Sequence, residues 1–171
     1  MVKVKFVLIN RSIFRTCGLI ITLLVLMVAC SRPDFHFIDG SKASIDDYKG
    51  RWLVINYWAE WCKPCIDEVP ELNRFHEQMN NSVSIVSISF DKVSNQALEA
   101  QVVKYGIEYP VIATAPKPAI DIPMPAALPA NYFVAPDGKR YGPVLGPHTA
   151  ESLAQKVKAF EVQWLSEKTE Q

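Results

Sequence analysis

The chain has 171 residues, 49% of them hydrophobic and 11% aromatic, and its 18 basic and 18 acidic residues leave no net charge. This length suits one domain with an appendage, and this composition excludes a disordered chain. The charge balance also argues against a nucleic-acid partner, which normally binds a basic face.

The chain begins with a basic stretch followed by an apolar one. The first acidic residue is Asp34, and "CGLIITLLVLMVA", residues 17–29, has thirteen positions without a charge. A membrane-spanning helix needs about twenty apolar residues, whereas the apolar centre of a secretory signal has about seven to fifteen. Residues 1–29 are therefore predicted to be an export signal, so that the mature part works where disulfides persist.

The end of this segment predicts a lipid anchor. "LMVACS", residues 26–31, resembles the cleavage box of bacterial lipoproteins, in which small residues precede a cysteine that becomes the lipid-bearing N-terminus. The resemblance implies lipidation of Cys30, a tether over 30–34, and attachment to a lipid bilayer on the periplasmic side of the cell envelope. Met27 stands where a branched aliphatic residue is more usual, and an ordinary signal peptide or an uncleaved anchor is the alternative.

Residues 35–171 are predicted to form the folded domain. A turn signal at Asp39-Gly40 indicates a short strand or hairpin at its start. "WLVINYW", residues 52–58, is dense in aromatic and β-branched residues, which is typical of a strand buried on both faces. An apolar stripe then predicts one amphipathic helix, kinked where Pro70 removes a backbone hydrogen bond. The stripe consists of Cys65, Val69, Leu72, His76 and Met79.

The second half of the domain is predicted to hold two more strands, a loop, a hairpin and two helices. A strand at 82–90 is followed by a helix that carries Leu98, Val102 and Tyr105 and ends at Gly106. Next come a strand at 109–113 and, within 131–146, a strand, a turn and a second strand. Thr149 is the predicted N-cap of the closing helix. Between them, "APKPAIDIPMPAALPA" has five prolines in sixteen residues, so the segment 116–129 must be a loop. This order predicts an α/β fold, a central mixed β-sheet flanked by helices, with a short N-terminal β extension.

Only two cysteines, Cys62 and Cys65, lie inside the predicted domain. As a structural staple they would close a loop of four residues, which stabilises by only about 2 kcal/mol. A zinc site needs four ligands, and the sequence has neither a second Cys-x-x-Cys pair nor paired histidines. A two-thiolate site for cuprous copper stays open, because soft thiolates select that ion.

A reaction centre fits the local chemistry best. If a helix begins near Cys62, the free amide groups of its first turn favour the thiolate. Cys65 would lie one turn deeper on the same face, where it could resolve a mixed disulfide formed by Cys62. Pro64 is tolerated in a first turn, and Lys63 adds a nearby cation.

The segment around the pair resembles a known family. "NYWAEWCKPC", residues 56–65, resembles the active-site signature of thioredoxin-like proteins, and with "DGSKASIDDYKG" before it and "IDEVPEL" after it the chain is similar to the TlpA/ResA-like branch. That branch consists of membrane-tethered, extracytoplasmic thiol–disulfide oxidoreductases with the thioredoxin fold. The resemblance implies Cys62 as the nucleophile, Cys65 as the resolving cysteine, and no cofactor beyond their disulfide.

The resemblance also implies partners. It favours reduction of protein disulfides in exported proteins, for example in cytochrome c maturation, with a membrane thiol reductase of the DsbD/CcdA kind as electron donor. Leu128-Pro129 takes the place of the family's cis-proline pair, which helps to bind an extended substrate. Trp61 and Pro64 are expected to contact substrate as well, whereas Ala130-Asn131 replaces the Thr-Thr or Thr-Ser pair that often follows that proline.

The acid–base group is predicted to be Glu68. Thioredoxin carries a buried aspartate on the strand before its active site, and the corresponding Asn56 cannot accept a proton. Glu68 matches a glutamate typical of the branch and, if partly buried, could take the proton of Cys65 during resolution. The alternative is a solvated surface residue. Other functions left open are a copper-binding lipoprotein, an oxidising exchange protein that uses the same cysteines, and an inert adaptor.

Overall fold

The computed structural model describes residues 33–79 and 81–170 of the chain. Its elements are β1 (Phe35–His36), β2 (Lys42–Ala43), the short 3-10 helix η1 (Ile45–Tyr48), β3 (Trp52–Trp58), α2 (Lys63–Asp67), α3 (Val69–Met79), β4 (Val83–Ser89), α4 (Asn95–Tyr105), β5 (Val111–Ile112), β6 (Ala130–Val134), β7 (Arg140–Leu145) and α5 (Ala150–Thr169). The predicted export signal and Cys30 lie outside the described residues. Within these residues, no helix has the length and apolar character needed to cross a membrane.

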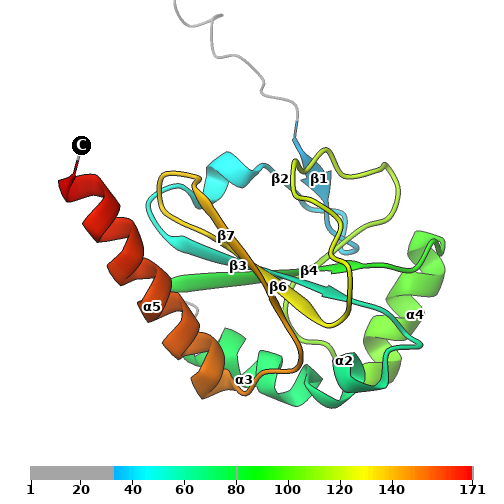
Figure 1. Ribbon diagram of the computed structural model, residues 1–171. Coiled ribbons are helices and arrows are strands. Elements are labelled where there is room, and N and C mark those ends of the chain that lie inside the picture. Colours follow the sequence, from blue (N-terminus) through cyan, green and yellow to red (C-terminus); the bar gives the residue numbers. More distant parts are fainter. Residues whose placement is uncertain (1–32, 80, 171) are drawn as a thin grey trace, which may run out of the picture. The chain divides into compact units, whose positions relative to one another are not determined.

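A mixed sheet of five strands forms the centre of the domain (Figure 1). The strand order is β5-β4-β3-β6-β7, with β3, β4 and β5 parallel, β6 antiparallel to β3, and β7 antiparallel to β6. All seven residues of β3 are buried, which explains why its sequence is an unbroken run of large side chains. The small β1–β2 pair is joined to the edge strand β5 by a bridge between Phe37 and Ile112. The predicted α/β architecture with a short N-terminal β extension is confirmed.

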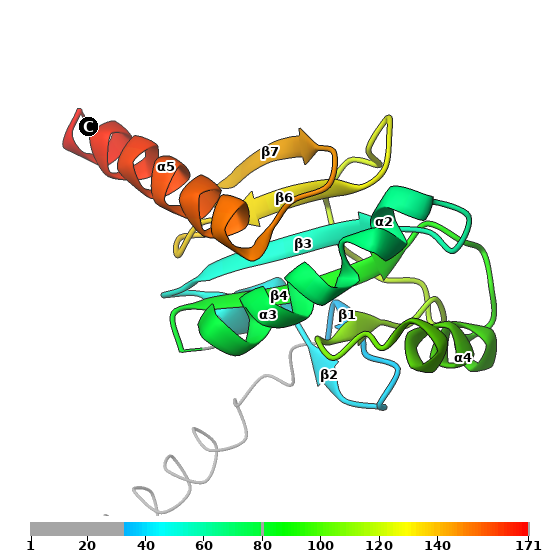
Figure 2. The ribbon, with the colours of Figure 1, turned by 90° about the horizontal axis from the view of Figure 1, so that it is seen from below.

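The two faces of the sheet carry separate apolar clusters. One cluster holds Leu72 of α3, Leu98 of α4 and Leu153 of α5, and it also contains both cysteines. Figure 2 shows α3 and α5 together on this side of the sheet. The other cluster is covered by the β1–β2 pair and by Ile120 and Ile122, so the proline-rich segment lies against the sheet as an irregular loop, as predicted.

The structure corrects the prediction of a single kinked helix. α2 ends at Asp67, α3 begins at Val69, and Glu68 forms the junction. Pro70 has no N–H to offer the carbonyl of Ile66, and as the second residue of α3 it occupies a first-turn position where an N–H has no helical partner anyway. The helix therefore restarts instead of bending, and the junction residue Glu68 is only 3% exposed.

The other predicted elements are present in the structure and differ from the predictions mainly in length. Gly106 ends α4 with a φ of 62°, and Thr149 caps α5, both as predicted. The strand predicted over 109–113 is shorter and comprises only β5. On α3 the buried residues are Val69, Leu72 and Phe75, whereas His76, which the predicted apolar stripe had included in place of Phe75, is partly exposed.

Candidate active site

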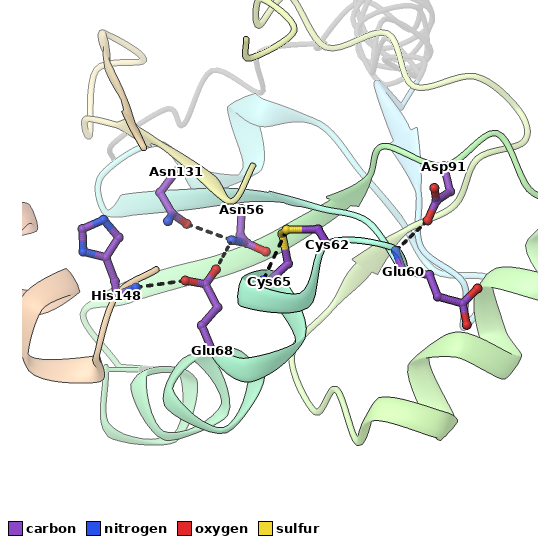
Figure 3. The surroundings of a disulfide bond; sticks show 8 residues. All are labelled: Asn56, Glu60, Cys62, Cys65, Glu68, Asp91, Asn131 and His148. Atoms are coloured by element: carbon purple, nitrogen blue, oxygen red, sulfur yellow. Dashed lines mark hydrogen bonds between the residues drawn. A yellow bond between two sulfur atoms is a disulfide. The ribbon is translucent and has the colours of Figure 1, made fainter. Parts of the chain in front are cut away.

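The two domain cysteines form a disulfide between the end of β3 and the first turn of α2 (Figure 3). Their Cα atoms are 5.3 Å apart. Cys62 is the N-cap of α2, and its sulfur accepts the backbone N–H of Cys65 at 3.3 Å. After reduction the same N–H would stabilise a thiolate at Cys62. Cys62 is 5% exposed and Cys65 1%, so both cysteines are buried and Cys62 is the more exposed of the two.

The predicted cation beside the pair is engaged elsewhere. Lys63 is exposed, and its Nζ lies 2.8 Å from both carboxylate oxygens of Asp67, one turn further along α2. The ion pair thus offsets the charge of Lys63, which limits its effect on the Cys62 sulfur. Pro64 occupies the first turn of α2 and is exposed, as expected for a residue that could contact a partner.

Glu68 is buried, so the solvated surface alternative is wrong. Its two carboxyl oxygens accept different hydrogen bonds: Oε1 accepts from Nδ2 of Asn56 at 3.0 Å, and Oε2 from the backbone N–H of His148 at 2.9 Å. Burial raises the pKa of Glu68 to about 7, although both hydrogen bonds oppose the rise. The carboxyl group can therefore hold or release a proton near neutral pH.

Two buried asparagines extend this network toward the sheet. Nδ2 of Asn56 also donates to Oδ1 of Asn131 at 3.1 Å, and both residues have no exposed surface. Asn56 and Asn131 face each other because β3 and β6 pair in that register. Glu68, Asn56 and Asn131 thus form one continuous polar chain beside the disulfide (Figure 3).

The predicted substrate contacts differ in exposure. Trp61 is 67% exposed and packs edge-on against Phe90, with ring centroids 6.4 Å apart. The peptide bond between Leu128 and Pro129 is cis, as the family resemblance implies. Leu128 packs against the cluster that contains the cysteines, and the carbonyl of Pro129 accepts the N–H of Gly146 at 2.9 Å.

The sequence predicted Glu68 but not the groups that surround it. His148 lies 80 residues further along the chain and Asn131 is 75 residues from Asn56, so no local pattern could show these contacts. Tyr109 was also missed; its buried hydroxyl has a pKa raised by burial and by the charge of Glu68. Over residues 33–79 and 81–170, no group of three or more His, Cys, Asp or Glu side chains is placed to hold a metal ion.

Comparisons with known proteins show to which family the chain belongs. The model of the AhpC/TSA family matches residues 28–139. The thiol–disulfide oxidoreductase ResA of Bacillus thuringiensis (strain Al Hakam) is 30% identical over 129 residues, which cover 74% of this chain and 74% of that protein.

Two solved structures share the fold. StoA from Bacillus subtilis has a TM-score of 0.61 at 22% identity, covering 71% of this chain and 92% of that one. The pneumococcal exposed lipoprotein thioredoxin from Streptococcus pneumoniae has a TM-score of 0.65 at 17% identity, covering 73% and 96%. At this identity the structures support the thioredoxin fold, while the family model and ResA support the family. The chain belongs to the AhpC/TSA family of thioredoxin-like proteins and is a thiol–disulfide oxidoreductase related to ResA.

Proposed function

We propose that the protein reduces disulfides of exported proteins through Cys62 and Cys65. In the dithiol form the Cys62 thiolate attacks a substrate disulfide, the substrate S–S bond breaks, and one substrate sulfur leaves as a thiolate that takes up a proton. Cys65 then loses its proton and attacks the Cys62 sulfur, which releases the second substrate thiol. Two electrons pass to the substrate, and the Cys62–Cys65 disulfide remains.

The charges around the Cys62 sulfur are the observation that supports the reducing direction. This sulfur receives the backbone N–H of Cys65, but Lys63 is held by Asp67. When ionised, the buried Glu68 adds negative charge near the pair (Figure 3). Strong oxidants of this class owe their potential to a stabilised reduced form. A reduced form without that stabilisation is a better electron donor.

Glu68 is assigned to take the proton of Cys65 in the second step. Its raised pKa, about 7, matches a group that must accept a proton from a thiol and return it near neutral pH. Its burial also keeps the exchanged proton away from bulk water. Glu68 thereby supplies the acid–base function that Asn56 lacks.

Substrate is assigned to the surface around the exposed Trp61 and Pro64 and the partly exposed Leu128, together with Pro129, whose side chain is buried. The exposed indole of Trp61 offers an apolar contact beside the disulfide, and aromatic side chains of this kind are typical of protein interfaces. An extended segment of an exported protein, such as apocytochrome c, would lie across this surface with its disulfide over Cys62.

The same proposal places the domain, residues 35–171, at a membrane surface. Residues 1–29 would be removed on export, and Cys30 would carry lipid at the end of the tether 30–34. A membrane thiol reductase of the DsbD/CcdA kind would return electrons to the pair. The apolar stretch and the lipoprotein relative from Streptococcus pneumoniae support this placement. A Cys30→Ser variant should move from the membrane fraction to the soluble fraction of the cell envelope, and an unchanged distribution would contradict lipid anchoring at Cys30.

Equilibration of the purified protein with glutathione buffers tests the reducing direction. The expected reduction potential lies between about −200 and −270 mV, the range of glutaredoxins and thioredoxin. A value near about −120 mV, typical of the strong periplasmic oxidants, would overturn the proposal. The Asp67→Asn variant frees Lys63 and should have a less negative potential. An unchanged potential in that variant would contradict the electrostatic explanation of the reducing direction.

A further inference from the structure

Two polar atoms of the asparagine pair are buried and unused. Oδ1 of Asn56 and Nδ2 of Asn131 have no hydrogen-bond partner within the described part of the chain. Leaving such atoms without a partner destabilises a protein, so each of them in a folded protein calls for an explanation. The structure holds the oxidised disulfide, in which Cys65 has no proton to donate.

The orientation of the Asn56 amide is fixed by its neighbours. Both hydrogens of Nδ2 are used, one by Oε1 of Glu68 and one by Oδ1 of Asn131. An ionised carboxylate only accepts hydrogen bonds, so Glu68 requires the nitrogen of Asn56 on its side. The carbonyl oxygen must then face the other way, and Figure 3 shows it pointing toward Cys65.

We propose that Asn56 is a further catalytic residue, whose side-chain amide bonds the Cys65 sulfur in both of its protonation states. In the reduced protein with Glu68 ionised, Oδ1 of Asn56 accepts the S–H of Cys65. Once Glu68 has taken that proton, the amide turns over, and Nδ2 of Asn56 donates to the Cys65 thiolate. This inference rests on the proposed role of Glu68 as proton acceptor.

The proton balance requires the amide to turn. Protonated Glu68 carries an O–H that needs an acceptor, and its Oε2 already accepts the backbone N–H of His148. The O–H on Oε1 therefore faces Asn56, which can accept it only with its carbonyl oxygen. Turning Asn56 brings its two N–H groups to the side of Cys65 at the moment when that sulfur becomes negative and is about to attack.

Asn131 can keep a hydrogen bond to Asn56 in both orientations, because the amide of Asn131 can turn as well. With Asn56 in its present orientation, Oδ1 of Asn131 accepts a bond; with Asn56 turned, the free Nδ2 of Asn131 can donate to the Asn56 oxygen. Asn131 is therefore a positioning residue that supports either state. Its unused nitrogen in the oxidised structure is the counterpart of the unused oxygen of Asn56.

Other titratable groups around Glu68 are accounted for. From the segment before β5, Tyr109 is a buried phenol whose pKa is raised, so it stays neutral near pH 7. From the loop before α5, His148 contributes its backbone N–H, while its ring Nδ1 contacts Ser152 and its pKa is lowered by burial. Glu71 of α3 accepts the backbone N–H of Ala150 and pairs with Arg74.

A double-mutant cycle on the reduced protein tests the assignment of Asn56. The Cys65 thiol is titrated by NMR with 13Cβ-labelled cysteine in the wild type, Asn56→Leu, Glu68→Gln and the double variant. Removing the amide donor should raise the pKa of Cys65 by about one unit, a tenfold loss of thiolate. In the Glu68→Gln background the effect should be at least as large, because the amide introduced at position 68 would donate to Asn56 and hold Nδ2 toward Cys65.

The two proposals fail separately in this cycle. If the effect of Asn56→Leu disappears in the Glu68→Gln background, Asn56 acts only through Glu68 and the direct contact is wrong. If Glu68→Gln alone changes neither the thiol titration nor the exchange rate, the proton shuttle is wrong, whereas the response to Asn56→Leu still reports on the contact. Cooperative unfolding of each variant is checked first, and the cycle is interpreted only for folded proteins.

A matched control and a measurement without mutation complete the test. Ser87 of β4 pairs with Asn56, is buried, and has a side-chain oxygen without a partner in the described residues. Ser87→Ala should leave the Cys65 titration unchanged, and an equal shift would show a general polarity effect instead. In the wild type, the side-chain 15N resonance of Asn56 should move as Cys65 titrates, and a resonance that does not move would overturn the proposal even if Asn56→Leu failed to fold.

Discussion

Raising the pH from 5 to 8 should lower the free energy of unfolding of the oxidised protein by about 2.5 kcal/mol through Glu68 alone. The pKa of this carboxyl is about 7 in the folded protein, against an ordinary value of 4.5. Between these two values the folded state holds a proton that the unfolded state has released. Because the folded state binds more protons, this contribution favours folding at low pH and is lost as the pH rises through 7.

Urea unfolding of the oxidised protein at a series of pH values measures this effect, since the disulfide removes any titration of the cysteines. The reference is the Glu68→Gln variant, whose amide keeps an acceptor for the His148 N–H but does not titrate. Stability differences between wild type and variant should fall with pH over this window. Parallel stability curves for the two proteins would contradict the raised pKa of Glu68, and other groups such as His148 cancel in the comparison.

Much of the fold could be predicted from local sequence because its signals are local. The buried run of β3 and the five prolines of the segment 116–129 each specify their structure within a few residues. The division between α2 and α3 could not be predicted in the same way. Helical spacing of apolar residues continues across Glu68, so the pattern indicated one helix, whereas the missing N–H of Pro70 allowed the backbone to restart.

The candidate site shows the same division between local and distant information. Cys62, Cys65 and Glu68 lie within seven residues; helical geometry suggested that the two cysteines act together, and the family resemblance added Glu68. The partners of Glu68 come from sheet pairing and from the loop before α5. Asn131 reaches Asn56 through the register of β3 with β6, which a single sequence does not reveal.

Replacing the cysteines singly should separate their two steps. The Cys65→Ser variant keeps the nucleophile but cannot resolve the mixed disulfide, so substrate proteins should accumulate as adducts on Cys62 that reducing agent releases. The Cys62→Ser variant should form no such adducts, because Cys65 is only 1% exposed. Non-reducing gels and mass spectrometry of the trapped species measure both results, and equal trapping by the two variants would contradict the assignment of Cys62 as nucleophile.

Catalysed reduction of insulin by dithiothreitol tests most directly whether the Cys62–Cys65 pair turns over protein disulfides. The wild-type protein should accelerate the reduction at substoichiometric concentration, and both single cysteine variants should lose this acceleration. A parallel titration with cuprous ion should show no tight stoichiometric binding to the reduced pair. Tight binding of one copper ion with no acceleration of insulin reduction would contradict the account and favour a copper-binding lipoprotein.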